Sequence, residues 1–209
     1  MSARLPDDEL TRSDEQPADV DLKLAAALER VGQALRVQMW DKAKRHALSP
    51  TQLQVLLRLA ADPPARRRIG VLAATLDVRH PTVSDAVATL ASKGLLERDR
   101  VSRRGALALT DRGLALADDL ADWHERTRAG LAGLPEADKQ TTLRLLLDLI
   151  AGLQRSGAIT IARMCVTCRF FRRDAHSGSG HPHHCALVDI PMADDQLRVD
   201  CAEHAANAA

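Results

Sequence analysis

Apolar residues recur at helical spacing along most of the chain. Residues 22–46 predict a long helix whose apolar residues share one face: Leu24, Leu28, Val31, Leu35 and Met39. Ser49 followed by Pro50 is typical of the start of a second helix, because serine caps helix N-termini and proline is tolerated in the first turn. The proline pair at 63–64 is expected to end it.

Two more amphipathic helices are predicted after residue 110. Thr110 is typical of an N-cap, and the helix after it is expected to run from Asp111 to about Leu131. Pro135 starts another helix that reaches about Arg155. One small domain offers little core for these apolar faces, so we expect the terminal helices to form a symmetric dimer. The alternative is that they pack on their own domain.

Between these helices, residues 69–113 predict a helix, a turn, a second helix and a β-hairpin. The first helix covers residues 71–77, and Pro81 stands where the second begins. Three apolar residues at helical spacing are expected to face the core: Val83, Val87 and Leu90. Strands are predicted to start at Leu95 and to end near Leu109. The chain as a whole is expected to be mainly α with a small β-hairpin wing.

Short polar side chains at the leading end of the second helix, with arginines in the hairpin, suit double-stranded DNA. One helix fits the major groove, and an arginine-bearing hairpin can reach the neighbouring minor groove. The predicted DNA contacts are Arg79, His80, Pro81, Thr82, Ser84, Asp85, Arg100, Arg103 and Arg104. The arginine triplet at 66–68 is either a further phosphate anchor or a solvated charge run. For the whole segment, the alternative is a helical hairpin with ordinary solvated charges.

Three stretches of the sequence carry a resemblance to a known family: LSPTQLQVLLRLA, HPTVSDAVATLASKGLLER and RRGALALTDRG. Over about residues 22–155 the chain resembles the MarR family of winged-helix transcriptional regulators. The resemblance implies a homodimer, a recognition helix near residues 81–93 and a wing around residues 101–106. It also implies a sequence-specific regulator, with repression as the favoured role, that reads a palindromic operator. A small-molecule effector stays open.

The cysteines form the second informative pattern. All four lie near the C-terminus in C-x2-C-x16-C-x15-C spacing, at Cys165, Cys168, Cys185 and Cys201. Clustered thiols without a secretion signal indicate a metal site rather than disulfides, and a set of unrelated reduced thiols is the alternative. We expect an iron–sulfur cluster, because a zinc ribbon would present two C-x2-C pairs. The spacing is similar to that of high-potential iron–sulfur proteins; zinc stays open, with His183 or His184 able to replace a thiolate.

These patterns divide the chain into a flexible acidic leader (1–20), a winged-helix and dimerisation domain (21–156) and a small Cys/His-rich extension (157–209), here called the tail. No stretch is apolar enough for a bilayer span or a signal peptide, so we expect a cytoplasmic protein. No catalytic motif is recognised, which favours a regulator over an enzyme. The redox or metal state of the four-cysteine site would then modulate DNA binding. The competing hypothesis is an iron–sulfur redox or electron-transfer protein that uses its winged helix for protein contacts.

Overall fold

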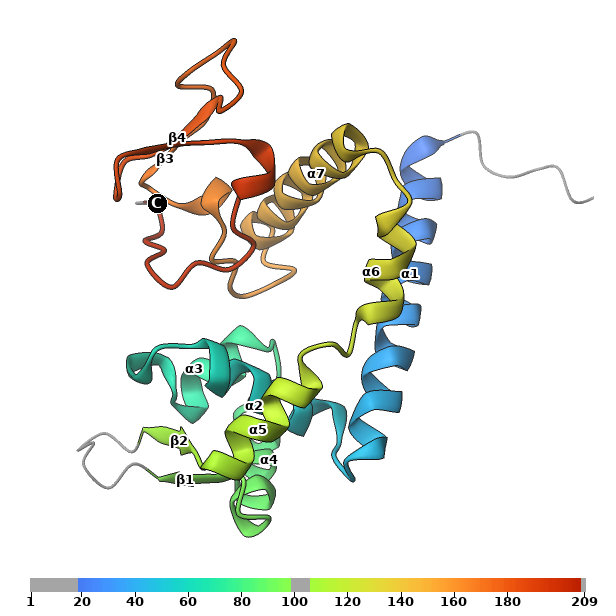
Figure 1. The fold of residues 1–209 in the computed structure, drawn as a ribbon, viewed down its shortest axis with the longest axis vertical. Helices are drawn as coiled ribbons and strands as arrows, with labels where there is room; N and C mark the ends of the chain where they lie inside the picture. Colours follow the sequence, from blue (N-terminus) through green and yellow to red (C-terminus); the bar gives the residue numbers. More distant parts are fainter. Residues whose placement is uncertain (1–18, 99–105, 208–209) are drawn as a thin grey trace, which may run out of the picture.

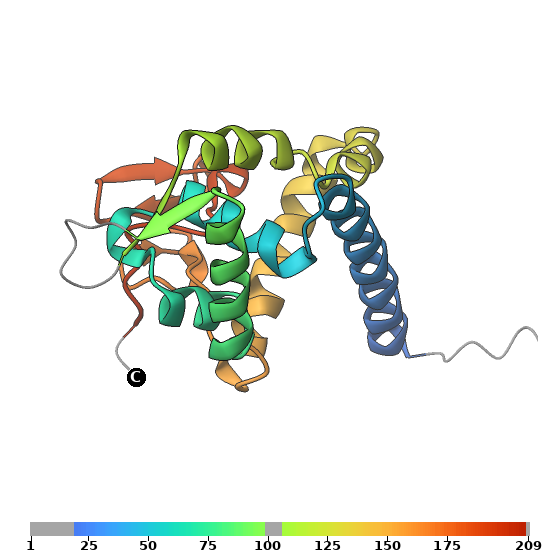
Figure 2. The ribbon, with the colours of Figure 1, turned by 90° about the horizontal axis from the view of Figure 1, so that it is seen from below.

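The computed structural model describes residues 19–98 and 106–207. The helices are α1 Val20–Arg45, α2 Pro50–Ala61, α3 Ile69–Thr75, α4 His80–Ser92, α5 Asp111–Leu120, α6 Glu125–Ala132 and α7 Glu136–Arg155. The strands are β1 Leu96–Arg98, β2 Leu107–Leu109, β3 Phe171–Arg172, β4 His183–Cys185 and β5 Ile190–Met192. Figures 1 and 2 show α1 as a long rod at one side of the molecule, away from the helices α3 and α4.

Helix α2 begins where the sequence predicts, because its first turn is capped from both directions. The Ser49 hydroxyl accepts a hydrogen bond from the backbone N–H of Gln52 at 3.2 Å, and the Gln52 side chain accepts one from the backbone N–H of Ser49 at 3.0 Å. This reciprocal arrangement satisfies two N–H groups that a helix start leaves without partners. Helix α2 then supplies the centre of the winged-helix unit, which we define as α2–α5 with β1 and β2.

The core of the winged-helix unit is aliphatic. Helix α2 buries four residues against α4 and α5: Leu53, Val55, Leu56 and Leu59. Helix α4 buries Val83, Val87 and Leu90, the three positions expected to face inward. The core therefore fixes the rotation of α4 about its axis and decides which side chains face solvent.

The wing strands pair antiparallel, with Leu96 opposite Leu109 and Arg98 opposite Leu107. The backbone N–H of Leu107 also donates to the carbonyl of Arg67 at 2.7 Å, so the hairpin is tied to the segment before α3. The strands lie within one or two residues of their predicted positions, and the predicted helices at 71–77 and 81–93 are found at 69–75 and 80–92. Most of the predicted wing, residues 101–105, and residues 1–18 of the leader lie outside the described residues.

The single helix predicted from Asp111 to about Leu131 is wrong. The chain leaves helical geometry after Leu120 and resumes it at Glu125. The break lets Trp123 pack against the winged-helix core, while α6 runs beside α1 and meets it through the Gln38 amide, 2.8 Å from the Thr127 hydroxyl. The break separates the contact of Trp123 with the core from the contact of Thr127 with α1. The helical periodicity of residues 111–131 does not indicate such a break, because these contacts are made with distant segments.

Among the residues that the structure describes, the outer part of α1 has no apolar partner. Leu24, Leu28 and Val31 are 56%, 40% and 50% exposed, although they form the predicted apolar stripe. Only near its C-terminal end does α1 reach the core, through Met39 and the buried Ala43. No helix within residues 19–98 and 106–207 is both long enough and apolar enough to cross a membrane.

Helix α7 has two apolar faces with different surroundings. One face packs on the tail, where Leu147 and Ala151 join Met164, Met192 and other residues in a second, smaller core. The opposite face leaves Leu145, Leu149 and Leu153 between 40% and 60% exposed. In the tail itself β4 pairs with β3 and β5, and every strand is only two or three residues long. The tail is therefore supported by α7 rather than by a large core of its own.

Gly113 gives a direct test of the packing between α5 and the wing. A Cβ atom at this position would lie 1.9 Å from the backbone oxygen of Leu95, so Gly113→Ala must push α5 away from the hairpin. We expect a loss of about 1–3 kcal/mol in the free energy of unfolding, measured by urea denaturation. The matched control is Gly70→Ala in α3, where no atom lies within 4 Å of the added Cβ. That control should keep or slightly raise stability, and an equal response of the two variants would contradict the described packing.

Candidate nucleic-acid interface and cysteine pocket

Helices α3 and α4 form a helix-turn-helix. The turn contains Asp77, whose φ of +50° lies in the left-handed region that aspartate tolerates better than most residues. Its carboxylate accepts a hydrogen bond from the backbone N–H of Thr160 in the tail at 3.0 Å. The turn is therefore fixed both by its own backbone and by a contact to a distant part of the chain.

The leading end of α4 presents polar groups to solvent. Six residues at this end of the helix are the predicted DNA contacts: Arg79, His80, Pro81, Thr82, Ser84 and Asp85. Ser84 is half-buried and the other five are exposed. No side chain caps this helix start, and its free N–H groups give it a partial positive charge. Phosphate oxygens would be favoured partners at such an end.

The other predicted contacts belong to the wing. The predicted contacts Arg100, Arg103 and Arg104 lie outside the described residues, so their place relative to α4 stays a prediction. Two residues of the arginine triplet are already engaged inside the chain. Arg67 donates to the carbonyl of Asp62 at 2.9 Å, and Arg66 donates to the carbonyls of Cys201 and Ala202 in the tail. These intramolecular bonds support a structural role for Arg66 and Arg67 instead of a phosphate anchor.

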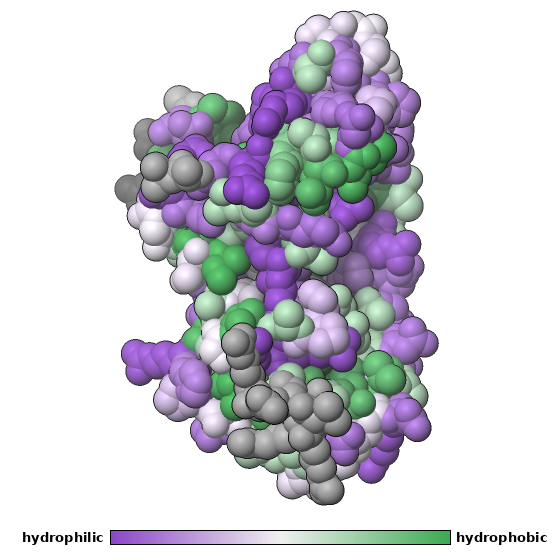
Figure 3. Space-filling model, turned by 90° about the vertical axis from the view of Figure 1, so that its left-hand side faces the viewer, coloured by the Kyte–Doolittle hydropathy of each residue, from purple (hydrophilic) through white to green (hydrophobic). Residues whose placement is uncertain are grey.

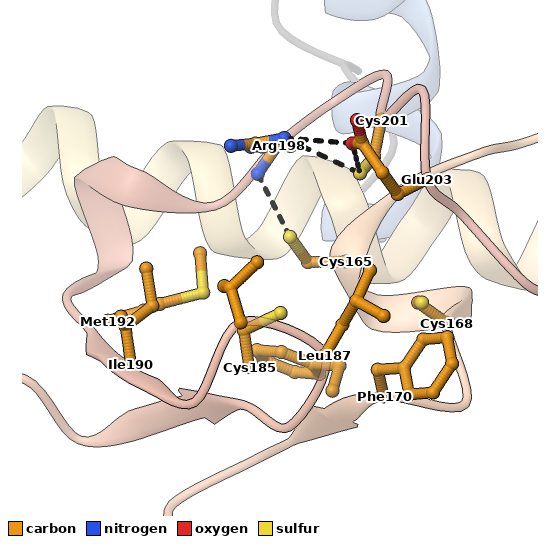
Figure 4. A pocket seen from close by; sticks show the side chains of 12 residues that line it. Cys165, Cys168, Phe170, Cys185, Leu187, Ile190, Met192, Arg198, Cys201 and Glu203 are labelled. Atoms are coloured by element: carbon orange, nitrogen blue, oxygen red, sulfur yellow. Dashed lines mark hydrogen bonds and ion pairs between the residues drawn. The ribbon is translucent and has the colours of Figure 1, made fainter.

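The four cysteines come together around one pocket in the tail. They arrive from separate segments: Cys165 and Cys168 from the short 3-10 turn Cys165–Thr167 and its end, Cys185 from the end of β4, and Cys201 from the C-terminal loop. Figure 4 shows their sulfur atoms pointing toward the space between these segments. All four thiols are free in this structure.

Backbone hydrogen bonds hold the cysteine segments in place. The N–H of Cys165 donates to the carbonyl of Arg198 at 3.1 Å, and the N–H of Cys201 donates to the carbonyl of Arg163 at 2.8 Å. The register of β3 with β4 places Phe171 opposite Cys185. Residues far apart in sequence are thus fixed around the pocket by the main chain, independently of any bond between the thiols.

The rest of the pocket wall is mostly apolar. Its other lining residues are Phe170, Phe171, Leu187, Val188, Ile190, Met192, Arg198 and Glu203. Leu187, Val188 and Ile190 are about half exposed, at 44%, 56% and 47%. Figure 3 shows hydrophobic side chains gathered on the upper part of the face where the tail lies. The pocket therefore opens beside an apolar patch.

Two charged residues approach the sulfur atoms. The backbone N–H of Arg198 donates to Cys165 Sγ at 3.2 Å, and its guanidinium lies 3.6 Å from Cys201 Sγ. Glu203 contacts both this guanidinium and the Cys201 thiol at 3.4 Å. Burial raises the pKa of the Cys165 thiol, the neighbouring Cys201 and Cys185 raise it further, and the Arg198 N–H opposes both effects.

The tail histidines bond to other groups instead of lining this pocket. Both ring nitrogens of the buried His183 are used: Nε2 lies 2.8 Å from the Asp194 carboxylate, and Nδ1 accepts the Asp174 N–H at 3.2 Å. His184 contacts Asp189 at 3.1 Å. In the described part of the chain, no three His, Cys, Asp or Glu side chains are grouped as ligands of one metal ion. The predicted metal role of the four cysteines stays a prediction.

A network of charges that the sequence patterns did not indicate joins the tail to the winged-helix unit. Arg163 pairs with the buried Asp62 at 3.2 Å and with Asp200 at 2.8 Å, and Arg58 also contacts Asp200. Burial alone would raise the pKa of Asp200, but the hydrogen bonds from Arg163 and Arg58 lower it overall. No local sequence pattern links residues so far apart, so the sequence could not predict this network. Arg198 at the cysteine pocket was also not predicted, although its position three residues before Cys201 was a possible signal.

Comparisons with known proteins match this geometry. Residues 47–105 match the model of the MarR family. The crystal structure of the transcriptional regulator PA3341 is 24% identical, with a TM-score of 0.55, and covers 63% of this chain and 98% of its own. The Staphylococcus aureus MepR–DNA complex is 20% identical, with a TM-score of 0.54, and covers 62% of this chain and 97% of its own. A MarR family protein from Bacillus stearothermophilus is 18% identical, with a TM-score of 0.55, and covers 64% of this chain and 94% of its own.

These matches define the class of fold. The chain has the fold of MarR-type winged-helix proteins, so the mainly helical fold with a small antiparallel wing is confirmed. A search of curated proteins returns no match. None of the three structures covers more than 64% of this chain, so over a third of it lies outside each comparison. The predicted domain limits and the individual DNA contacts stay predictions.

Arg163 provides a test of the link between tail and winged-helix unit. Arg163→Ala would leave the Asp62 side chain, which is 5% exposed, buried without its cationic partner. We expect a loss of about 3 kcal/mol in the free energy of unfolding, because a buried charge deprived of its partner is costly. The matched control is Arg173→Ala, also in the tail, which breaks an exposed pair with Asp148 and should cost under about 1 kcal/mol. Similar losses in urea denaturation would show that the buried pair does not join the two parts.

Proposed function

We propose that this protein is a sequence-specific, double-stranded-DNA-binding transcriptional regulator that acts as a homodimer, with repression as its mode. The observation that carries the proposal is the helix-turn-helix matched by the MarR family model, with the small polar side chains of Thr82 and Ser84 at the leading end of α4. Side chains of this size allow the helix to approach base edges in the major groove. That MepR has been solved with DNA supports the proposal.

The dimer is formed by the apolar faces that this chain leaves uncovered. They lie on the outer part of α1, at the end of α6 and on one side of α7, and their most exposed members include Leu22, Leu24, Leu131, Leu134, Leu145 and Leu149. A second copy of the chain is their natural partner, because a two-fold axis covers the same face on both copies. The axis would also set two α4 helices about one DNA turn apart, which suits a palindromic operator.

The state of the four-cysteine pocket modulates DNA binding through the contacts between tail and winged-helix unit. Arg66 lies three residues before the start of α3 and donates to the carbonyl of Cys201, one of the pocket residues. Asp77, in the turn between α3 and α4, accepts the Thr160 N–H. A change that loosens the pocket would release both ends of α3, so the position of α4 depends on the tail.

DNA recognition is tested by in vitro selection of duplexes from a random pool with the full chain, followed by affinity measurements at several salt concentrations. Thr82→Ala combined with Ser84→Ala should weaken binding to the selected site about tenfold or more, since each base contact is worth about 1–3 kcal/mol. Arg103→Ala combined with Arg104→Ala removes four arginines from a dimer, so it should weaken binding and lower the salt slope by up to about 4.

The control is Ser92→Ala at the far end of α4, where the hydroxyl only donates to the carbonyl of Thr89. It should bind DNA like the wild type. The selected complex should contain two chains per duplex and a palindromic sequence. A selection without enrichment, or unchanged affinity in both double variants, would end the proposal and favour a redox protein that uses the winged helix for protein contacts.

Modulation is tested by a double-mutant cycle on operator affinity. Cys185→Ser alters the pocket without touching α4 and should change the dissociation constant about fivefold or more. In an Arg66→Ala background, which lacks the bond to the tail carbonyls, the same substitution should have a clearly smaller effect. Circular dichroism establishes that each variant is folded, and His181→Ala, an exposed tail substitution, serves as the control. Equal effects of Cys185→Ser in both backgrounds would show that Arg66 does not carry the coupling.

A further inference from the structure

We propose that the tail pocket binds an iron–sulfur cluster whose protein ligands are Cys165, Cys168, Cys185 and Cys201. The first observation is convergence. Four residues from separate segments line one pocket and direct their sulfur atoms toward the space between them (Figure 4). They are all the cysteines that the chain contains. Four thiolates are the usual ligand set of iron–sulfur clusters.

The second observation is that the four thiols share one cavity. All four cysteines line a single cavity of about 60 Å³. A cluster separates its thiolates by several metal and sulfide atoms, so its ligands surround a space and do not meet at one point. Cysteines distributed around the wall of a cavity suit that arrangement.

The third observation is the composition of the pocket. Phe170, Leu187, Ile190 and Met192 supply an apolar wall, and no histidine lines the pocket. His183, two residues before Cys185, already uses both ring nitrogens for Asp174 and Asp194. His184, which adjoins Cys185, contacts Asp189 and His176 instead. A zinc site of mixed cysteine and histidine ligands therefore has no histidine to draw on here. Apolar walls exclude water from a cluster and so protect it.

The fourth observation is the pair of hydrogen-bond donors from Arg198. Its backbone N–H points to Cys165 Sγ and its guanidinium to Cys201 Sγ. On binding, each thiol gives up its proton, and a cluster held by four thiolates carries net negative charge. Donors to the sulfur atoms and a nearby cation stabilise that charge and tune the reduction potential. Arg198 is accordingly a positioning residue, not a ligand.

The fifth observation is the weakness of the tail without a cross-link. Its strands have two or three residues, and its core depends on α7 for Leu147 and Ala151. Segments this small are usually stabilised by disulfides or a metal, and the thiols here are free. A cluster bonded to three separate segments would supply that stabilisation. This inference is independent of the proposed DNA binding.

The test uses the full chain purified without oxygen from cells grown with added iron. Iron, inorganic sulfide and zinc are measured per chain, together with the visible and electron paramagnetic resonance spectra. We expect iron and sulfide in equal amounts, at least two of each per chain, and a broad absorption band near ~400 nm. One zinc per chain with no iron, or no bound metal at all, would overturn the proposal.

Variants assign the ligands. Cys185→Ser and Cys201→Ser should each lose at least half of the bound iron, whereas His181→Ala should keep all of it. A cysteine variant could fail to fold, so a second test uses Arg198→Gln, which keeps all four thiols. It should retain the cluster, with a reduction potential shifted to more negative values by loss of the nearby cation. Iron content unchanged in both cysteine variants, or an unshifted potential in Arg198→Gln, would contradict the assigned geometry.

Discussion

The ion pair between Arg163 and Asp62 joins the two parts of this molecule. Asp62 ends α2 at the centre of the winged-helix unit, and Arg163 opens the tail two residues before Cys165. The side chains of Arg163 and Asp62 are 10% and 5% exposed, so removing either one would leave the other buried without its partner. Asp200 extends the pair toward Cys201. Together with the contacts of Arg66 and Asp77, this buried pair fixes the cysteine pocket relative to α3 and α4.

The tail adds contacts to the winged-helix unit that lie close to α3. The winged-helix unit presents the polar end of α4 to solvent, and the apolar faces of α1 and α7 are exposed among the described residues. The tail adds hydrogen bonds at both ends of α3, through Arg66 and Asp77. A bound group in the tail could thus influence α4 without approaching DNA, because rigid packing transmits small displacements through a short helix.

Local signals predicted much of the fold. The cap at Ser49, the inward positions of α4 and the two wing strands follow from interactions within a few residues of each other. The break after Leu120 did not, because it arises from a competition between the core contact of Trp123 and the contact of α6 with α1. The two faces of α7 are a similar case. Its leucines read as one amphipathic pattern, but one side packs on the tail and the other stays exposed.

The sequence by itself determined where α2 and α5 begin, which side of α4 is polar, and that the thiols are gathered in one short segment. These properties depend on neighbours along the chain, through hydrogen bonds, helical periodicity and spacing. Only the tertiary structure decided that four cysteines surround one pocket, that the adjacent histidines bond elsewhere, and that Arg163 reaches across 101 positions to Asp62. Such contacts depend on how whole segments pack, and no local preference of the chain encodes them.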